Sequence, residues 1–141
     1  VVDEEAKYFP SEYLHVGGDE VKTKEWHFSA TARNFAKAQG FDPNTQITFI
    51  QAYFQSIAAE RAIKNGKRPV VWEEAADEWK NLSKQAVVMM WLIKHTSTQQ
   101  EYEERVQNIT RLGYDVVLAP EHYTYLDFVD GDGGRYNNPM I

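Results

Sequence analysis

The sequence predicts an α/β fold built on a parallel sheet, and three observations lead to this prediction. Four short apolar segments read as strands, and segments with helical patterns separate them along the chain. The apolar segments do not alternate with polar residues, as expected of strands that are covered on both faces. A repeated order of strand and helix favours parallel pairing with crossover helices. The pattern fits either a doubly wound open sheet or a stretch of a (β/α)8 barrel.

The first half of the chain reads as strand, helix, helix and strand. Residues 13–16 form an apolar run before a glycine pair, and residues 25–39 have a helical pattern that Gly40 stops. A second helix is predicted from about residue 45 to residue 65, where Gly66 closes it. Residues 69–72 then form the second strand. The apolar positions with helical spacing in the second helix are Ile47, Ile50, Phe54, Ile57 and Ala58.

The second half reads as helix, strand, helix and strand. A short helix over residues 75–82 leads to a third strand over residues 86–91. Thr98 and Glu101 form a capping-box pattern, which predicts a helix start, and Gly113 ends that helix. Residues 115–119 form the fourth strand. The side chains that this last helix should bury are Tyr102, Val106, Ile109 and Leu112.

Length and composition exclude several classes of protein. The 141 residues are enough for one domain with a core, and a net charge of −6 argues against a nucleic-acid partner. The absence of cysteine excludes disulfides, zinc-thiolate sites and thiol catalysis. No apolar run is long enough to cross a bilayer, and no signal peptide is recognisable. The first residue is valine, so we expect the natural N-terminus to lie upstream.

The most informative segment is His15-Val-Gly-Gly-Asp-Glu20, which follows the first strand. Neighbouring side chains on a regular strand point to opposite faces, so adjacent acids could not share a substrate there. Gly17 and Gly18 can adopt backbone angles that other residues avoid, which allows a sharp turn that presents Asp19 and Glu20 together. Alternatively, the two acids form a solvated turn that caps the next helix. His15, in the middle of the strand, is expected to be a buried, hydrogen-bonded residue rather than a metal ligand. No second histidine lies at metal-ligand spacing.

Polar or aromatic residues follow each predicted strand. Trp72 ends the second strand, Trp91 ends the third, and residues 121–127 follow the fourth. Active sites of (β/α)8 enzymes form at this carboxyl end of the strands, although a full barrel needs roughly 250 residues. The two tryptophans would otherwise be core residues. The acidic residues at these strand ends are Glu73, Glu74 and Glu121. They either add negative potential to the site or are ordinary surface residues.

These residues resemble a known family. The segment that ends in Asp19-Glu20 is similar to the His-x-Gly-Gly-Asp-Glu signature of the β-N-acetylhexosaminidases of glycoside hydrolase family 20. Val70-Val-Trp-Glu73, Trp91 and Tyr125-Leu-Asp127 resemble later elements of that family, in the same order. The resemblance implies a partial (β/α)8 barrel, with residues 1–141 forming part of one catalytic domain, roughly its fourth to seventh strands.

The resemblance also implies an activity, the retaining hydrolysis of terminal β-linked N-acetylglucosamine or N-acetylgalactosamine. The acetamido oxygen of the substrate would attack the anomeric carbon and form an oxazolinium intermediate, without a protein nucleophile. Glu20 would be the general acid, kept protonated by burial and a nearby carboxylate. Asp19 would orient the acetamido group. The substrate-binding residues that the resemblance implies are Trp72, Trp91, Tyr125 and Asp127.

The implied partners are oligosaccharides or glycoconjugates that contain N-acetylhexosamine, at an extracytoplasmic location. We expect no metal, cofactor, nucleic acid or membrane partner, and self-association through open barrel edges. The family's first-strand arginine, its eighth-strand Trp–Glu pair and the acid–His relay behind its catalytic glutamate have no match here. Two alternatives remain: an inactive fragment that binds sugar or acts as a scaffold, and a barrel hydrolase that uses two protein carboxylates.

Overall fold

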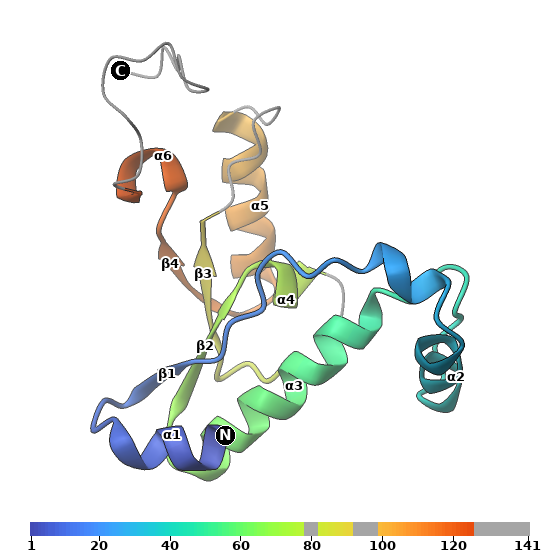
Figure 1. Cartoon of the computed structure of the whole chain (residues 1–141). Helices are drawn as coiled ribbons and strands as arrows, with labels where there is room; N and C mark the ends of the chain where they lie inside the picture. The colour runs from blue at the N-terminus through green and yellow to red at the C-terminus, as the bar shows by residue number, and fades with distance from the viewer. Residues whose placement is uncertain (78–81, 92–98, 126–141) are drawn as a thin grey trace.

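The computed structural model describes residues 1–77, 82–91 and 99–125, and within them four parallel strands form one sheet. The strands lie in the order of the sequence, β1-β2-β3-β4 (Figure 1). A doubly wound sheet reverses its strand order at a switch point, so the consecutive order favours the barrel-type arrangement. The strands are β1 (Tyr13–His15), β2 (Arg68–Trp72), β3 (Val87–Met90) and β4 (Asp115–Leu118).

The helices connect the strands, and α3 and α5 lie on the same side of the sheet (Figure 1). Parallel strands require such crossovers, and right-handed connections between strands in sequence order place the helices on one face. The order of elements thus agrees with the predicted alternation. The helices are α1 (Val2–Tyr8), the 3-10 helix η1 (Lys24–His27), α2 (Ala30–Ala38), α3 (Phe49–Lys64), α4 (Glu74–Asp77), α5 (Gln99–Arg111) and α6 (Glu121–Thr124).

The helix predicted over residues 25–39 is two elements rather than one. The 3-10 helix η1 ends at His27, and Ser29 then caps α2 by accepting a hydrogen bond from the Ala32 N–H at 3.2 Å. Serine favours this capping position over a helix interior because its hydroxyl bonds the free backbone N–H groups of the first turn. The predicted stop is confirmed, since Gly40 has a positive φ of 82°.

Helix α3 exists as predicted, but its expected apolar face is wrong. Phe54 is 57% exposed and Ile57 is 39% exposed, although Ile50 is buried. Small side chains permit a helix to approach a sheet closely, so they occupy the contact with the sheet in place of the larger apolar residues. The buried residues of α3 are Ile50, Ala52, Gln55, Ser56, Ala59 and Ala62.

The two outer strands are more exposed than a doubly covered strand would be. Most residues of β4 are exposed, including Val117 at 42% and Leu118 at 58%, and Tyr13 of β1 is 46% exposed. Within the described residues each outer strand pairs on one side only, whereas β2 and β3 pair on both sides and are mostly buried. The expectation of strands covered on both faces therefore holds for the central pair alone.

The main core lies between the central strands and the helices. Val71, Val88 and Met90 are fully buried there, and Ile109 of α5 packs against them, as the sequence predicts. Leu112, which was expected to be buried, is 47% exposed and lies beyond the end of α5. The capping residue Thr98 and residues 78–81 of the predicted short helix lie outside the described residues.

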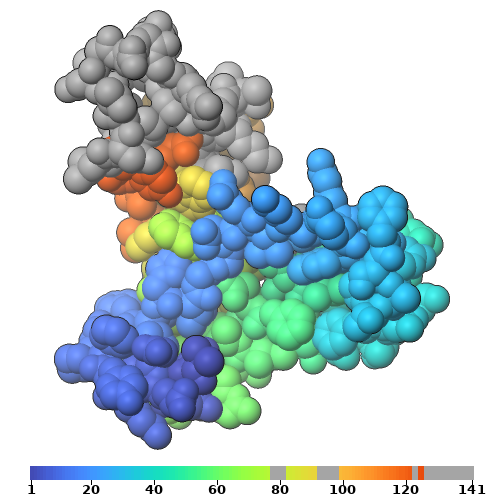
Figure 2. Space-filling model, in the orientation of Figure 1, coloured from blue at the N-terminus to red at the C-terminus, as the bar shows by residue number. Residues whose placement is uncertain are grey.

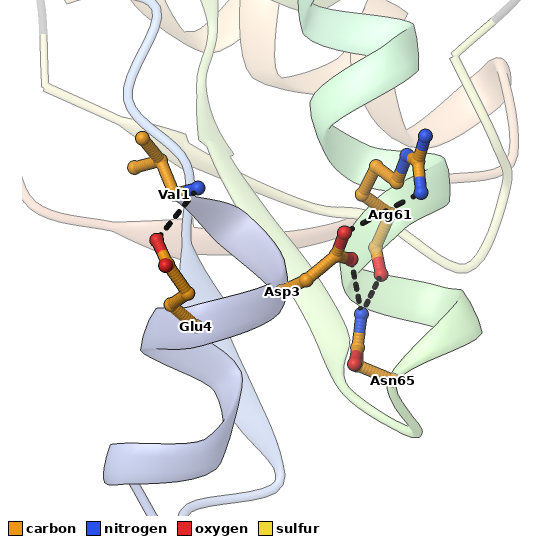
Figure 3. Close-up of polar contacts among 5 residues, drawn as sticks. All are labelled: Val1, Asp3, Glu4, Arg61 and Asn65. Atoms are coloured by element: carbon orange, nitrogen blue, oxygen red, sulfur yellow. Dashed lines mark hydrogen bonds and ion pairs between the residues drawn. The ribbon is translucent and has the colours of Figure 1, made fainter.

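Polar contacts attach the first helix to the end of α3 (Figure 3). Asp3 accepts hydrogen bonds from Asn65 at 2.7 Å and from Arg61 at 3.4 Å. Lys67 donates to the carbonyl oxygens of Phe9 and Ser11 at 2.6 and 2.7 Å. These contacts lie at the amino-terminal ends of the strands, away from the predicted site.

Candidate active site

The turn after β1 carries the acid pair. The Val16 N–H donates to the Val70 carbonyl at 2.9 Å and the Trp72 N–H donates to the Gly17 carbonyl at 3.1 Å, so pairing with β2 continues to Gly17. Gly17 and Gly18 then have φ angles of +76° and +113°. Only glycine adopts such angles without strain. The predicted glycine turn is therefore present, and both acids that follow it are exposed.

Two glutamines of α3 hold this turn, and the sequence analysis did not identify them. Gln51 Nε2 donates to the Gly18 carbonyl at 2.7 Å, and Gln55 Nε2 donates to the Val16 carbonyl at 3.2 Å. Residues four apart lie on one face of a helix, so both amides reach the same loop. Figure 2 shows the segment that follows β1 lying across the surface of α3. The spacing of two glutamines in a helix was the available signal, but it is a weak one.

The three aromatic residues predicted to bind substrate lie in one row at the carboxyl ends of the strands. The ring centroids of Trp72 and Trp91 are 6.1 Å apart in an edge-to-face arrangement. Tyr125 stacks on Trp91 with a centroid distance of 5.9 Å and an interplanar angle of 3°. His15 extends the row, with its ring 4.8 Å from that of Trp72. Trp91 is 7% exposed, whereas Tyr125 is 38% exposed and His15 is also exposed, so the row is buried at Trp91 and reaches the surface at both ends.

The acidic residues near these strand ends differ in position. Glu73 is fully buried, accepts a hydrogen bond from the Trp91 N–H at 3.0 Å, and forms an ion pair with Arg105 at 3.8 Å. Glu121 is also buried, at 8% exposed. Glu74 is half-buried, and its two carboxylate oxygens lie 3.3 Å from Trp91 Nε1 and 3.5 Å from the Glu20 backbone nitrogen. Glu73 and Glu121 are thus interior residues, and Glu74 links two predicted site residues.

His15 is hydrogen-bonded as expected, but it is exposed rather than buried. Its Nδ1 accepts a hydrogen bond from the Gly17 N–H at 3.0 Å, which requires that nitrogen to be unprotonated. Partial desolvation lowers the pKa of His15 below its ordinary value, and the carboxylate of Asp19 opposes this shift. The geometry and the pKa direction both favour neutral His15 beside the acid pair.

Among the residues that the structure describes, no group of three or more His, Asp or Glu side chains could hold a metal ion. No helix among the described residues combines the length and the apolar character needed to cross a membrane. Asp127, the remaining predicted site residue, lies outside the described residues.

An open groove of about 480 Å³ lies at the opposite, amino-terminal ends of the strands. Its cationic side chains already have partners within the protein: Arg68 pairs with Asp115, and Lys84 lies 3.6 Å from the ring centroid of Tyr114. Lys67 bonds backbone carbonyls, as described above. The groove is therefore a weaker candidate for a functional site than the strand ends that carry the acid pair.

Comparison with known sequences identifies one family. A sequence model described as "Glycosyl hydrolase family 20, catalytic domain" matches residues 1–140. A β-hexosaminidase of Vibrio furnissii is 34% identical over 127 residues, which are 90% of this chain and 19% of that protein. The β-hexosaminidase subunit beta of Homo sapiens is 25% identical over 131 residues, covering 93% of this chain and 22% of that protein. The chain thus spans about a fifth of the length of these relatives.

Solved structures show the same relationship in three dimensions. An exo-β-N-acetylglucosaminidase from Vibrio harveyi, solved in complex with N-acetylglucosamine, superposes with a TM-score of 0.68 at 34% identity. The match covers 84% of this chain and 17% of that one. A β-N-acetylhexosaminidase from Bacteroides fragilis has a TM-score of 0.72 at 24% identity over 92% of this chain and 24% of that one, and shows likeness of fold alone. The predicted fold class, a partial (β/α)8 barrel, is confirmed.

Proposed function

The chain belongs to the catalytic domain of glycosyl hydrolase family 20, and from this membership we propose that the intact protein removes terminal β-linked N-acetylhexosamine residues. The observation that carries the proposal is the row of Trp72, Trp91 and Tyr125 at the strand ends that also carry Asp19 and Glu20. Aromatic faces suit the apolar faces of a sugar ring. In this proposal residues 1–141 supply about the fourth to seventh strands of the barrel.

We propose that the first step uses the substrate as its own nucleophile. The acetamido oxygen attacks the anomeric carbon, and the bond to the leaving oxygen breaks as Glu20 protonates that oxygen. Asp19 accepts a hydrogen bond from the acetamido N–H, and the Tyr125 hydroxyl donates one to the acetamido oxygen. The product of this step is an oxazolinium ion and a free aglycone. Holding an internal nucleophile in place can supply effective molarities of about 10⁵–10⁸ M.

The second step reverses the proton transfer. Glu20, now a carboxylate, removes a proton from a water molecule that attacks the anomeric carbon, and the acetamide is regenerated with net retention. General acid–base catalysis typically contributes about 10²–10⁴-fold in rate. Trp72 and Trp91 would exclude other water and fix the pose, and Asp127 would bind a sugar hydroxyl. The two acids are exposed in this chain, so the enclosure of Glu20 that this proposal needs would come from the rest of the barrel.

The substrates we propose are oligosaccharides or glycoconjugates of the extracytoplasmic space, and their acetamido group gives the test. The intact protein should release nitrophenol from 4-nitrophenyl β-N-acetylglucosaminide. It should act far more slowly on the N-trifluoroacetyl analogue, because fluorine makes the attacking oxygen less nucleophilic. The matched control is 4-nitrophenyl β-glucoside, which has no acetamide and should not be hydrolysed.

Three outcomes would contradict the proposal in different ways. Equal rates on the acetamide and the plain glucoside would favour a hydrolase with two protein carboxylates. Equal rates on the acetyl and trifluoroacetyl substrates would show that the acetamido oxygen is not the nucleophile. Binding of N-acetylglucosamine without any turnover would favour a sugar-binding or scaffold role.

A further inference from the structure

The backbone of Glu20, the proposed acid, is unusual among the described residues. Its φ is +46°, and it is the one residue other than glycine with a positive φ in that part of the chain. Side chains larger than glycine disfavour this conformation. Such a backbone persists where its surroundings hold it in place, and it occurs often at functional sites. A contact with another part of the chain is therefore expected to hold the Glu20 backbone.

Glu74, the first residue of α4, provides that contact. Its Oε1 lies 3.5 Å from the Glu20 backbone nitrogen and accepts its hydrogen bond, across 54 residues of sequence. Its Oε2 accepts from the Trp91 indole nitrogen at 3.3 Å. One carboxylate thus bridges the acid-bearing turn after β1 and the aromatic residue after β3. Both contacts are longer than the usual ~2.9 Å, so each is a long hydrogen bond to a charged acceptor.

The rest of Trp91 is fixed independently of Glu74. Its backbone N–H donates to Glu73 at 3.0 Å, and its carbonyl accepts from the Glu121 N–H at 3.1 Å. With the backbone held, the contact to Glu74 acts together with the ring contacts to Trp72 and Tyr125 to orient the indole. Glu74 is half-buried rather than fully buried, so its replacement should leave the core of the domain intact.

We propose that Glu74 is a positioning residue that holds the Glu20 backbone and the Trp91 indole in one fixed relation. This inference rests on the proposed function, because it assigns Glu74 a part in placing the acid against the sugar pocket. A displacement of about 1 Å can cost an enzyme about 10²-fold in rate. Glu74→Gln keeps the shape of the side chain but replaces one acceptor oxygen by a donor, so one of the two contacts must fail.

The test uses the intact protein with Glu74→Gln and a matched control, Glu60→Gln, which changes an exposed glutamate of α3. With 4-nitrophenyl β-N-acetylglucosaminide, Glu74→Gln should lower kcat by about 10- to 100-fold. KM and the thermal midpoint should change little, since the change affects alignment rather than folding. Glu60→Gln should behave as the wild type. A Glu74→Gln protein with the kcat of the control would overturn the proposal.

A second measurement does not require activity. Tryptophan emission of the free protein should change in Glu74→Gln, because the indole of Trp91 loses a charged hydrogen-bond acceptor. The same substitution in a Trp91→Phe background should leave the emission unchanged. In that background Glu74→Gln should also lower kcat by a smaller factor than in the wild type. Equal emission changes in both backgrounds would overturn the proposal. A wild-type protein without hydrolase activity would instead refute the proposed function. The emission result would still show whether Glu74 contacts the Trp91 indole.

Discussion

Replacing Gly18 by alanine should destabilise the protein more than replacing Gly17. An alanine Cβ at Gly18 would lie 2.3 Å from Gln55 Nε2, whereas a Cβ at Gly17 would have no neighbour within 4 Å. Both glycines have positive φ, and a strained residue costs about 1–3 kcal/mol. At Gly18 the displaced Gln55 also loses its hydrogen bond to Val16 in a buried site, which adds about 1–3 kcal/mol.

Urea denaturation of the intact protein measures this difference. Gly17→Ala should lower the free energy of unfolding by about 1–3 kcal/mol and Gly18→Ala by about 2–6 kcal/mol. Gln55→Ala removes the atom that clashes, so the double variant Gly18→Ala/Gln55→Ala should lose less than the sum of the two single losses. Equal losses at the two glycines, or additive losses in the double variant, would refute the reasoning that α3 and the turn are in steric contact.

Three further predictions concern the same region and the edges of the sheet. Asp19→Asn should lower the pKa of His15 further, because the carboxylate now opposes the desolvation of the imidazole. Folding stability should then fall more steeply below a pH of about 6.5, where the unfolded state binds the proton that folded His15 resists. NMR titration of the imidazole checks the pKa, and an unchanged value would contradict it. Arg105→Met should cost about 1–3 kcal/mol by removing the ion pair that Arg105 forms with the buried Glu73 carboxylate, and Arg111→Met, at an exposed position of the same helix, is the control in a urea titration. The 141-residue chain alone should self-associate through β1 and β4, and light scattering from a compact monomer would contradict this.

The strands were predictable because each is a short apolar run bounded by glycine, proline or polar residues. β2 and β3 lie within one residue of their predicted ends, and the glycine turn before Asp19 has the positive φ angles that its sequence requires. These features depend on neighbours in the sequence. The aromatic row followed from them, because parallel strands place their carboxyl ends at one edge.

The errors lie where distant contacts decide the structure. Phe54 and Ile57 have the spacing of a buried helix face, yet the close approach of α3 to β2 selects small residues instead. The hydrogen bond from the Glu20 backbone to Glu74 joins residues 54 positions apart, and no local sequence pattern predicts it. Gln51 and Gln55 likewise bond a loop that precedes their helix by more than 30 residues.

The assignment of Glu20 as the general acid is tested most directly by the Glu20→Gln variant. The measurement is how much kcat/KM this variant loses on substrates with different leaving groups. Glutamine cannot donate a proton, so kcat/KM should fall by about 10²–10⁴-fold for chitobiose, whose leaving sugar needs protonation. The loss should be much smaller for a dinitrophenyl N-acetylglucosaminide, whose leaving group departs as a stable anion. A Glu20→Gln protein that lost the same factor on both substrates, or lost nothing on chitobiose, would contradict the assignment of Glu20 as the general acid.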